Sequence, residues 1–395
     1  MNVTRVAYWG VVIGLLAFTT SVEAFTSGST GADGAFNPTA STTLQVPASG
    51  VFHFTTVTIP SGVLVTFTPN AANSPVTILA TGDVTINGTV SVNGSAGAIY
   101  TLGGQGGSGG PGGYRGGTGA GASGSIGGAG LGPGGGLGGT SSTQQAGSPG
   151  SFGTAGSIGF GGTAPPTYGT PGLLPLIGGS GGGAAWGTSA GGGGGGGGAL
   201  LIASSGAIVV NGAITANGGG GGSGFGAGGS GGAIRLVATK ITGAGSLSAS
   251  GGVAAYSNAG GSGRIRLEAE ILERNSSTTP VASAGFPLPL ALSTPPMLKI
   301  VSVGGVLAPD PPGGGLGALD ILLPTQSGPV AIELAGSGIL LGTTAVVKVT
   351  PESGAAPTTV TSTPLSGTVA SSTASASATL PSGSSFVTAT VTIAP

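Results

Sequence analysis

Two stretches of the sequence decide the fold: VTILATGDVTINGTVSVNG, residues Val76 to Gly94, and LLIASSGAIVVNGAITANG, residues Leu200 to Gly218. They align without a gap, and both Asn-Gly pairs of the first fall on those of the second. In each stretch apolar residues alternate with polar ones, which is typical of strands with one buried face. Asn and Gly accept the sharp backbone bend that a corner demands. The alignment therefore predicts strand units stacked in register.

Two further copies extend the repeat. Residues Ile234 to Gly251 form a third copy with one residue deleted, and a fourth starts at Arg264 and stops early. No unit can bury its apolar face alone, so stacking is expected to build a continuous column of Val, Ile, Leu and Ala. We predict an all-β fold: a parallel β-helix (solenoid) over residues 25–274, with a long glycine-rich insertion at 97–198. A β-sandwich of ordinary hairpins is the alternative, because Asn-Gly is also the strongest hairpin signal.

The insertion separates the first copy from the second and is nearly half glycine. Since the flanking copies match residue for residue, it must leave and return at the same corner of the stack. It is either a flexible coil or a packed set of polyglycine-type helices, in which only glycine lets backbones approach closely enough to hydrogen-bond. We favour the packed form, because a flexible linker has no use for the aromatic residues embedded in the insertion. Three of them form the predicted contact surface: Tyr114, Tyr168 and Trp186.

The two ends of the chain differ from the repeats. Residues 1–24 have the pattern of a signal peptide, and the small residues Val22 and Ala24 indicate cleavage after Ala24. An uncleaved anchor is the alternative, but the apolar run is short for a membrane span and no later segment approaches one. Residues 275–296 are predicted to be a Pro/Ser/Thr linker, and 297–395 an immunoglobulin-like (Ig-like) β-sandwich without the Cys-Trp-Cys pin. The protein is expected to be secreted, and extracellular or associated with the cell surface.

Composition excludes several classes of function. Charged residues make up 5% of the chain and the formal net charge is −1, so a basic surface for nucleic acid is not expected. The chain has no cysteine, which removes disulfides, thiolate nucleophiles and Cys-ligated metals together. The one histidine, His53, has no acidic residue or second histidine near it in the sequence, and Asp33 is too isolated to form a calcium loop. No metal or other cofactor is predicted.

The main cluster of charges lies in RIRLEAEILER, residues 264–274. This stretch could place a carboxylate pair beside arginines, which would suit acid–base chemistry on a polysaccharide. We favour a structural interpretation, in which the charged row is the outer face that closes the last unit, since terminal repeats need such caps. No catalytic residue is therefore predicted, and the chain is not expected to be an enzyme. Because strand residues alternate between faces, four charged residues are expected to share one face: Arg264, Arg266, Glu268 and Glu270.

Several strings give the chain a resemblance to a class of proteins: STGADGAFNPTASTTLQVP, YGTPGLLPLIGGSGGG, GGGALLIASSGAIVVNGAITANGG and GGAIRLVATKITG. On these strings, between Ser27 and Leu267, the chain resembles uncharacterised secreted bacterial glycine-rich β-solenoid proteins of the surface or extracellular structural type. The resemblance implies an architecture and a structural role outside the cell. It implies no activity, so no functional residue is carried over.

These observations predict a non-enzymatic structural or adhesive protein of the cell surface or extracellular matrix. Its expected partners are further copies of itself or a surface polysaccharide. A carbohydrate-binding or carbohydrate-cleaving β-helix is the first alternative, and it is favoured if Tyr114, Tyr168 and Trp186 line one exposed groove.

Ice binding is the second alternative, because a stacked β-structure can present rows of threonine. A regular Thr-x-Thr in every unit is not found, and matching positions in later copies are read as Ser, Ala or Gly. Five threonines are nevertheless compatible with such a row: Thr55, Thr56, Thr58, Thr66 and Thr68.

Overall fold

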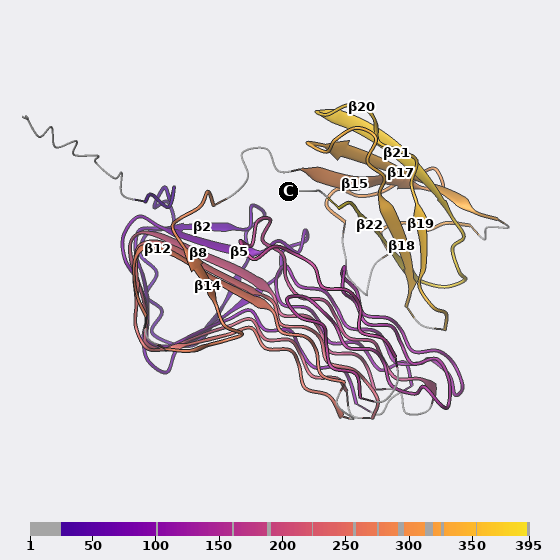
Figure 1. Ribbon diagram of the computed structural model, residues 1–395, viewed down its shortest axis with the longest axis horizontal. Helices are drawn as coiled ribbons and strands as arrows, with labels where there is room; N and C mark the ends of the chain where they lie inside the picture. The colour runs from indigo at the N-terminus through magenta and orange to yellow at the C-terminus, as the bar shows by residue number, and fades with distance from the viewer. Residues whose placement is uncertain are drawn as a thin grey trace, which may run out of the picture.

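The computed structural model of the chain consists of strands and long extended segments (Figure 1). It describes residues 25–99, 102–159, 162–187, 191–222, 224–255, 258–274, 276–290, 296–312, 319–324, 328–352 and 354–392. No α-helix occurs within these ranges. The signal peptide predicted for residues 1–24 lies outside the described residues.

Two parallel sheets contain the repeated units. The strands of the eight-stranded sheet are β2 (Val51–Phe54), β3 (Val57–Ile59), β5 (Val76–Ala80), β6 (Val84–Ile86), β8 (Ala199–Val210), β10 (Ala233–Thr242), β12 (Arg264–Glu273) and β14 (Ser283–Gly285). Their order is β14-β12-β10-β8-β5-β2, with β3 paired to β6 and β6 to β8. The strands of the six-stranded sheet are β1 (Thr42–Gln45), β4 (Leu64–Thr68), β7 (Thr89–Ser91), β9 (Ala213–Thr215), β11 (Ser246–Ser248) and β13 (Thr278–Thr279). They lie in chain order across the sheet.

The register of the strands matches the sequence alignment. Val76 pairs with Leu200, and Val90 pairs with Ile214. In the third copy Ile234 also pairs with Leu200, and a register shift between β8 and β10 takes up the deleted residue. The predicted parallel, in-register pairing of the copies is confirmed.

The eight-stranded sheet is buried on both faces. Its inner face and that of the six-stranded sheet share one cluster of buried side chains that runs through all the units. Its outer face carries a second, smaller cluster, where Leu201 and Val237 pack with Phe25, Leu176 and Leu290. Burial on both faces explains why β8 begins with an unbroken apolar run, ALLIA, instead of an alternating pattern. The shared inner cluster includes Val84, Ile86, Val90, Ile208, Val210, Ile214, Ile234, Leu236, Leu247, Ile265 and Leu267.

A layer of extended glycine-rich chain adjoins the parallel sheets. We call it the glycine array, and it comprises residues 92–98, 104–120, 126–139, 145–157, 178–187, 191–198, 216–222, 226–232, 249–254 and 258–263. Its segments run away from the sheets as long hairpins, toward the lower right in Figure 1. They are joined to one another by hydrogen bonds between backbone groups.

The segment 191–198 shows how the array is built. The N–H groups of three successive residues, Gly193 to Gly195, donate to three different segments, and the next three residues donate to the same segments in the same order. A repeat of three residues is that of the extended polyproline-type helix, which has no internal hydrogen bonds and therefore directs them to its neighbours. The packed form of the insertion is thus confirmed. The acceptors, in chain order of the donors, are the carbonyl groups of Gly117, Ala227, Ser95, Tyr114, Ser230 and Val92.

Close approach of the backbones explains where glycine is required. A Cβ atom added to Gly195 would lie 2.1 Å from the carbonyl oxygen of Ser108, which no real structure could accommodate without moving the backbone. A segment with neighbours on all sides must therefore be glycine throughout, as the eight residues from Gly191 to Gly198 are. A segment at the surface can carry a side chain at every third position, as Gln105 and Ser108 do.

The fold class predicted from the sequence, a parallel β-helix (solenoid) with a glycine-rich insertion followed by an Ig-like β-sandwich, is wrong. The chain forms separate parallel sheets of six and eight strands. After β7, β9 and β11 it does not turn directly into the next strand, but runs out and back through the glycine array. The insertion at 97–198 shares this array with the glycines of the other copies. The strand pattern specifies in-register parallel pairing, which both architectures use, and so it could not distinguish them.

The C-terminal strands form two antiparallel sheets. The five-stranded sheet has the order β16-β15-β17-β21-β20 and the other the order β19-β18-β22, and they share one hydrophobic core. This division differs from the four-plus-three arrangement of Ig constant domains, which strand count and spacing alone could not reveal. The bounds are β15 (Met297–Val303), β16 (Val306–Leu307), β17 (Val330–Ser337), β18 (Val346–Pro351), β19 (Thr358–Thr361), β20 (Ser366–Thr368), β21 (Ser371–Ala378) and β22 (Ser385–Thr390).

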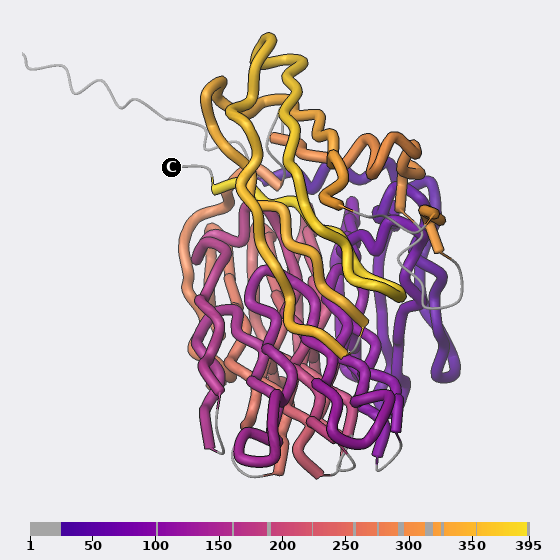
Figure 2. The backbone as a smooth tube through the Cα atoms, turned by 90° about the vertical axis from the view of Figure 1, so that its right-hand side faces the viewer, coloured from indigo at the N-terminus to yellow at the C-terminus, as the bar shows by residue number. Residues whose placement is uncertain are grey.

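The antiparallel sheets contact the glycine array through a few groups (Figure 2). The Arg115 side chain lies 3.6 Å from Glu352 Oε1, and its guanidinium carbon lies 4.8 Å from the centroid of the Phe386 ring. The N–H of Gly354 donates to the carbonyl of Ile126. Burial lowers the pKa of Arg115, and the charge of Glu352 acts against that shift.

We expect Gly195→Ala to lower the free energy of unfolding by at least about 3 kcal/mol, because its Cβ would overlap backbone atoms of the neighbouring segment. The matched control is Gly220→Ala, whose Cβ would approach the carbonyl oxygen of Val253 no closer than 3.0 Å. We expect that variant to change stability by less than about 1 kcal/mol. Denaturant unfolding of both variants measures the difference, and equal losses would contradict this account of the array.

Candidate functional site

Of the four charged residues predicted to close the last unit, Glu268 is buried and the other three are half-buried. Arg235 on β10 and Glu268 on β12 are both fully buried. Arg235 donates from Nη2 to Oε2 of Glu268 at 2.9 Å and from Nε to Oε1 at 3.2 Å. Arg266 donates from Nε to the same Oε1 at 3.1 Å. We call these three side chains the Arg-Glu-Arg cluster.

Residues 286–290, which read FPLPL, cover the cluster. The N–H of Leu288 donates to Glu268 Oε2 at 2.8 Å, and Arg235 donates to three successive carbonyl groups of the same segment. Residues predicted as a linker, 275–296, thus supply β13, β14 and this cover. The charged row does lie on the outer face, as the sequence predicted. Its central carboxylate is buried rather than exposed, because the apolar residues of the linker pack over it.

The carboxylate of Glu268 is fully occupied. Its Oε1 accepts from both arginines, and its Oε2 accepts from Arg235 and from the backbone of Leu288. A carboxylate accepts about four hydrogen bonds in all, so none of its capacity is left for a substrate proton. The arrangement fits a structural cluster better than an acid–base pair.

We expect Glu268→Gln to lower the free energy of unfolding by about 3–5 kcal/mol, because it leaves Arg235 buried without a counter-charge. The matched control on the same strand is Glu273→Gln, whose side chain is 60% exposed in its pair with Lys240. That exposed pair is expected to contribute at most about 1 kcal/mol. Denaturant unfolding of the two variants tests the assignment, and a loss in Glu268→Gln no larger than that in the control would refute it.

The fold places the Asp33 side chain next to the backbone of His53. Asp33 Oδ2 accepts the N–H of His53 at 2.6 Å, and His53 Nδ1 accepts the N–H of Thr30 at 3.3 Å. The carboxylate therefore contacts the peptide group of His53 and not its ring. Within the described ranges, no three His, Asp or Glu side chains are grouped so that they could hold a metal ion.

The three aromatic residues predicted as a contact surface belong to the packing of the glycine array. Tyr114, Tyr168 and Trp186 are all half-buried. The hydroxyl of Tyr168 donates to the carbonyl of Gly178 at 2.7 Å and accepts from Ser180 Oγ at 2.9 Å. Burial raises the pKa of both tyrosines. The two hydrogen bonds hold the Tyr168 hydroxyl inside the molecule, where it cannot form the floor of an open sugar groove.

A regular set of hydroxyl groups lies on the outer face of the six-stranded sheet. The apolar residues of these strands point into the core, so the residues between them point outward. The strand register then places one hydroxyl side chain from each strand in a single row across the sheet: Thr43, Thr66, Ser91, Thr215, Ser248 and Thr279.

Two flanking rows complete this surface, which we call the hydroxyl face. They lie two residues before and two residues after the central row on each strand, so neighbouring rows are about 6.6 Å apart, and neighbouring strands about 4.8 Å. None of the side chains in the three rows is charged. The flanking residues are Ser41, Leu64, Thr89, Ala213, Ser246 and Ser277 on one side, and Gln45, Thr68, Asn93, Asn217, Ser250 and Val281 on the other.

Hydrogen bonds between neighbouring strands order the hydroxyl face. The hydroxyls of Thr43 and Thr66 lie 2.7 Å apart, and Ser248 donates to Asn217 Oδ1 at 2.7 Å. Asn93 Oδ1 accepts the N–H of Asn217 at 2.7 Å. These bonds order part of the face, whereas the hydroxyl oxygen of Thr215 in the central row is buried and has no hydrogen-bond partner among the described residues.

The hydroxyl face corrects one expectation from the sequence. Positions matching Thr66 carry Ser or Thr in every strand of the sheet, whereas Ser, Ala or Gly is expected from the sequence at the matching positions in later copies. Thr68 also lies on this face, but Thr58 belongs to β3 of the other sheet. A strand-by-strand comparison of STT, LVT, TVS, AIT and SLS, aligned in register, would have revealed the row in the third position.

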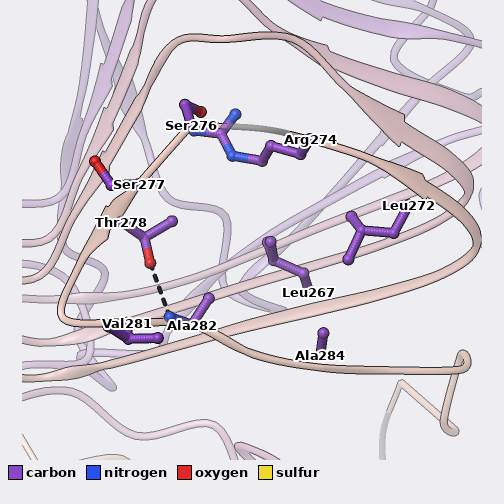
Figure 3. Close-up of a pocket in the computed structure, with 9 residues that line it drawn as sticks. All are labelled: Leu267, Leu272, Arg274, Ser276, Ser277, Thr278, Val281, Ala282 and Ala284. Atoms are coloured by element: carbon purple, nitrogen blue, oxygen red, sulfur yellow. Dashed lines mark hydrogen bonds between the residues drawn. The ribbon is translucent and has the colours of Figure 1, made fainter.

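A small cavity of about 240 Å³ lies at the last unit, beside the ends of β12, β13 and β14 (Figure 3). Its lining is mainly apolar, with Arg274 and three small hydroxyl residues at one side. Arg274 donates to the backbone carbonyls of Gly243 and Gly245, so its guanidinium fastens the last unit to the preceding one. The cavity is the unfilled end of the hydrophobic column and holds no acid–base group.

No family model, curated protein or solved structure matches this chain. Among the residues the structure describes, no helix has the length and apolar character needed to cross a bilayer.

Proposed function

We propose that this chain is a non-enzymatic structural or adhesive protein that acts outside the cell, and that its hydroxyl face binds an uncharged surface polysaccharide. The observation that carries the proposal is the central row of six hydroxyl side chains, one from each strand of the six-stranded sheet. The predicted signal peptide supports the location. The occupied carboxylate of Glu268 supports a role without catalysis.

The chemistry of the face favours a polymer of hydroxyl groups over a charged partner. An anionic or cationic polymer would lose its solvation against a surface that offers no counter-charge. A neutral polysaccharide exchanges its hydrogen bonds to water for bonds to Ser, Thr and Asn, at little electrostatic cost. Two pairs of side chains on the face, Thr43 with Thr66 and Ser248 with Asn217, are already held by each other, which reduces the entropy that they lose on binding.

The glycine array supports a mechanical role. Its hydrogen bonds join segments far apart in the sequence, as between Gly195 and Ser95, and they involve no side chains that could rearrange. Such a layer is a stiff support for the hydroxyl face. A stiff body with a broad contact face suits adhesion.

We expect the full mature chain to sediment with insoluble neutral polysaccharide, for which microcrystalline cellulose and chitin are the probes. In Thr66→Arg/Thr215→Arg, binding is expected to fall by at least about tenfold, because each substitution introduces a charge that the polymer cannot compensate. The matched control is Thr373→Arg, at an exposed position of β21 in the antiparallel sheets. Unchanged binding in the double variant, or an equal loss in the control, would count against the hydroxyl face as the contact.

Ice is the second candidate ligand, because the surface of an ice crystal is also a periodic lattice of uncharged donors and acceptors. Regular spacing of the hydroxyl rows favours this candidate specifically. Thermal hysteresis that disappears in Thr66→Arg/Thr215→Arg and persists in Thr373→Arg would select ice. Polysaccharide binding without hysteresis would exclude it.

A further inference from the structure

Residues 25–33 form a strap across the outer face of the eight-stranded sheet. Ser27 donates from its N–H to Ser205 Oγ on β8, and from Oγ to the carbonyl of Ala80 on β5. Ser29 donates from Oγ to the carbonyl of Phe54 on β2. The strap thus crosses the strands one after another.

The strap begins at the last long strand of the stack. The backbone nitrogen of Phe25 donates to Glu270 Oε1 on β12 at 3.0 Å. Phe25 also packs its ring against the outer apolar cluster, beside Leu201 and Val237. The first described residue is therefore anchored by both its side chain and its backbone nitrogen.

Glu270 has an acceptor role but no basic partner. Within the described ranges, no Lys or Arg nitrogen forms an ion pair with Glu270, although its neighbour Glu268 is paired with two arginines. In the uncleaved chain Phe25 offers this carboxylate only a neutral amide N–H. Cleavage after Ala24 would convert that amide into an α-ammonium group at the same place.

We propose that signal-peptide cleavage creates a binding partner for Glu270: the new α-ammonium group of Phe25 forms an ion pair with this carboxylate and locks the strap onto the sheet. Hydrolysis of the Ala24–Phe25 peptide bond by water supplies the amine, which takes up a proton at neutral pH. A neutral N–H···O contact then becomes a charge-assisted one, about twice as strong. The inference rests on the predicted cleavage site and is independent of the ligand of the hydroxyl face.

The stability that this ion pair adds depends on pH, because the α-amino group of Phe25 titrates. An α-amino group has a pKa of about 8 in an unfolded chain, and a neighbouring carboxylate raises it in the folded protein. The added stability is therefore present below pH 8 and is lost as the pH rises through the raised pKa. Among the other charged groups near the strap, Arg235, Glu268 and Arg266 are paired with one another and Lys240 is paired with Glu273. Asp33 and His53 lie at the far end of the strap.

Four proteins test the lock: chains that start at Phe25, and chains with Gly-Ser added before it, each with Glu270 or with Glu270→Gln. At pH 6.5 the free Phe25 terminus is expected to raise the thermal midpoint by about 1–3 °C over the extended chain, and the gain is expected to vanish at pH 9.5. In Glu270→Gln the gain is expected to be absent at both pH values, while the amide still accepts the Phe25 N–H and the fold is kept. Equal midpoints at pH 6.5, or a gain that survives Glu270→Gln, would overturn the proposal.

Two further measurements do not depend on stability. The intact mass of the protein exported by a bacterial host should correspond to a chain that begins at Phe25, and another start would refute the inference. Acylation of the Phe25 amine at pH 7 by an N-hydroxysuccinimide ester should be several-fold slower with Glu270 than with Glu270→Gln, because the paired amine stays protonated. The lysine residues of the same samples serve as the internal standard, and equal rates would refute the pairing.

Discussion

The constraint on which the rest of the structure depends is the approach of backbone to backbone without side chains between. In the glycine array each segment directs its hydrogen bonds to several neighbours in turn, since an extended helix of three residues per turn cannot satisfy them internally. This arrangement is possible only where no Cβ atom lies between two backbones that are hydrogen-bonded to each other. The composition of each segment therefore reflects its position in the array. The enclosed segment 191–198 is glycine throughout, whereas the segment 104–109 carries exposed side chains three residues apart, at Gln105 and Ser108.

The array and the parallel sheets depend on each other. Polyglycine segments contain no sequence information that could fix their register, because every residue offers the same donor and acceptor. Apolar columns between the two sheets supply that information, since a shift by one residue would turn Val84 or Ile208 out of the core. In return, the array holds together the ends of strands such as β7 and β9, which are only three residues long. Neither part would be expected to form a stable sheet or bundle alone.

The sequence predicted the features that depend on the pattern of apolar and polar side chains along each strand. It gave the register of the copies to the residue, including the pairing of Val76 with Leu200, and it placed Ile265 and Leu267 in the core. It missed the features that depend on what lies opposite a strand. The burial of Glu268 under Leu288, and the hydroxyl row through Thr66 and Thr215, require knowledge of which distant segments become neighbours. The prediction of the fold class failed for the same reason. Alternating apolar residues show that a strand has a buried face, but they do not show what path the chain takes from one sheet to the other.

The strap has a consequence for the order in which the chain can fold. Its first residue contacts β12, about 245 positions later in the chain, and it crosses strands of every intervening unit. During synthesis the strap therefore emerges long before its binding site exists, and it must wait for the last unit to assemble. Contacts of such large sequence separation are slow to form, because a long loop has to close first. The strap is then among the last parts to dock, and an incompletely synthesised molecule keeps the apolar outer face of its eight-stranded sheet uncovered.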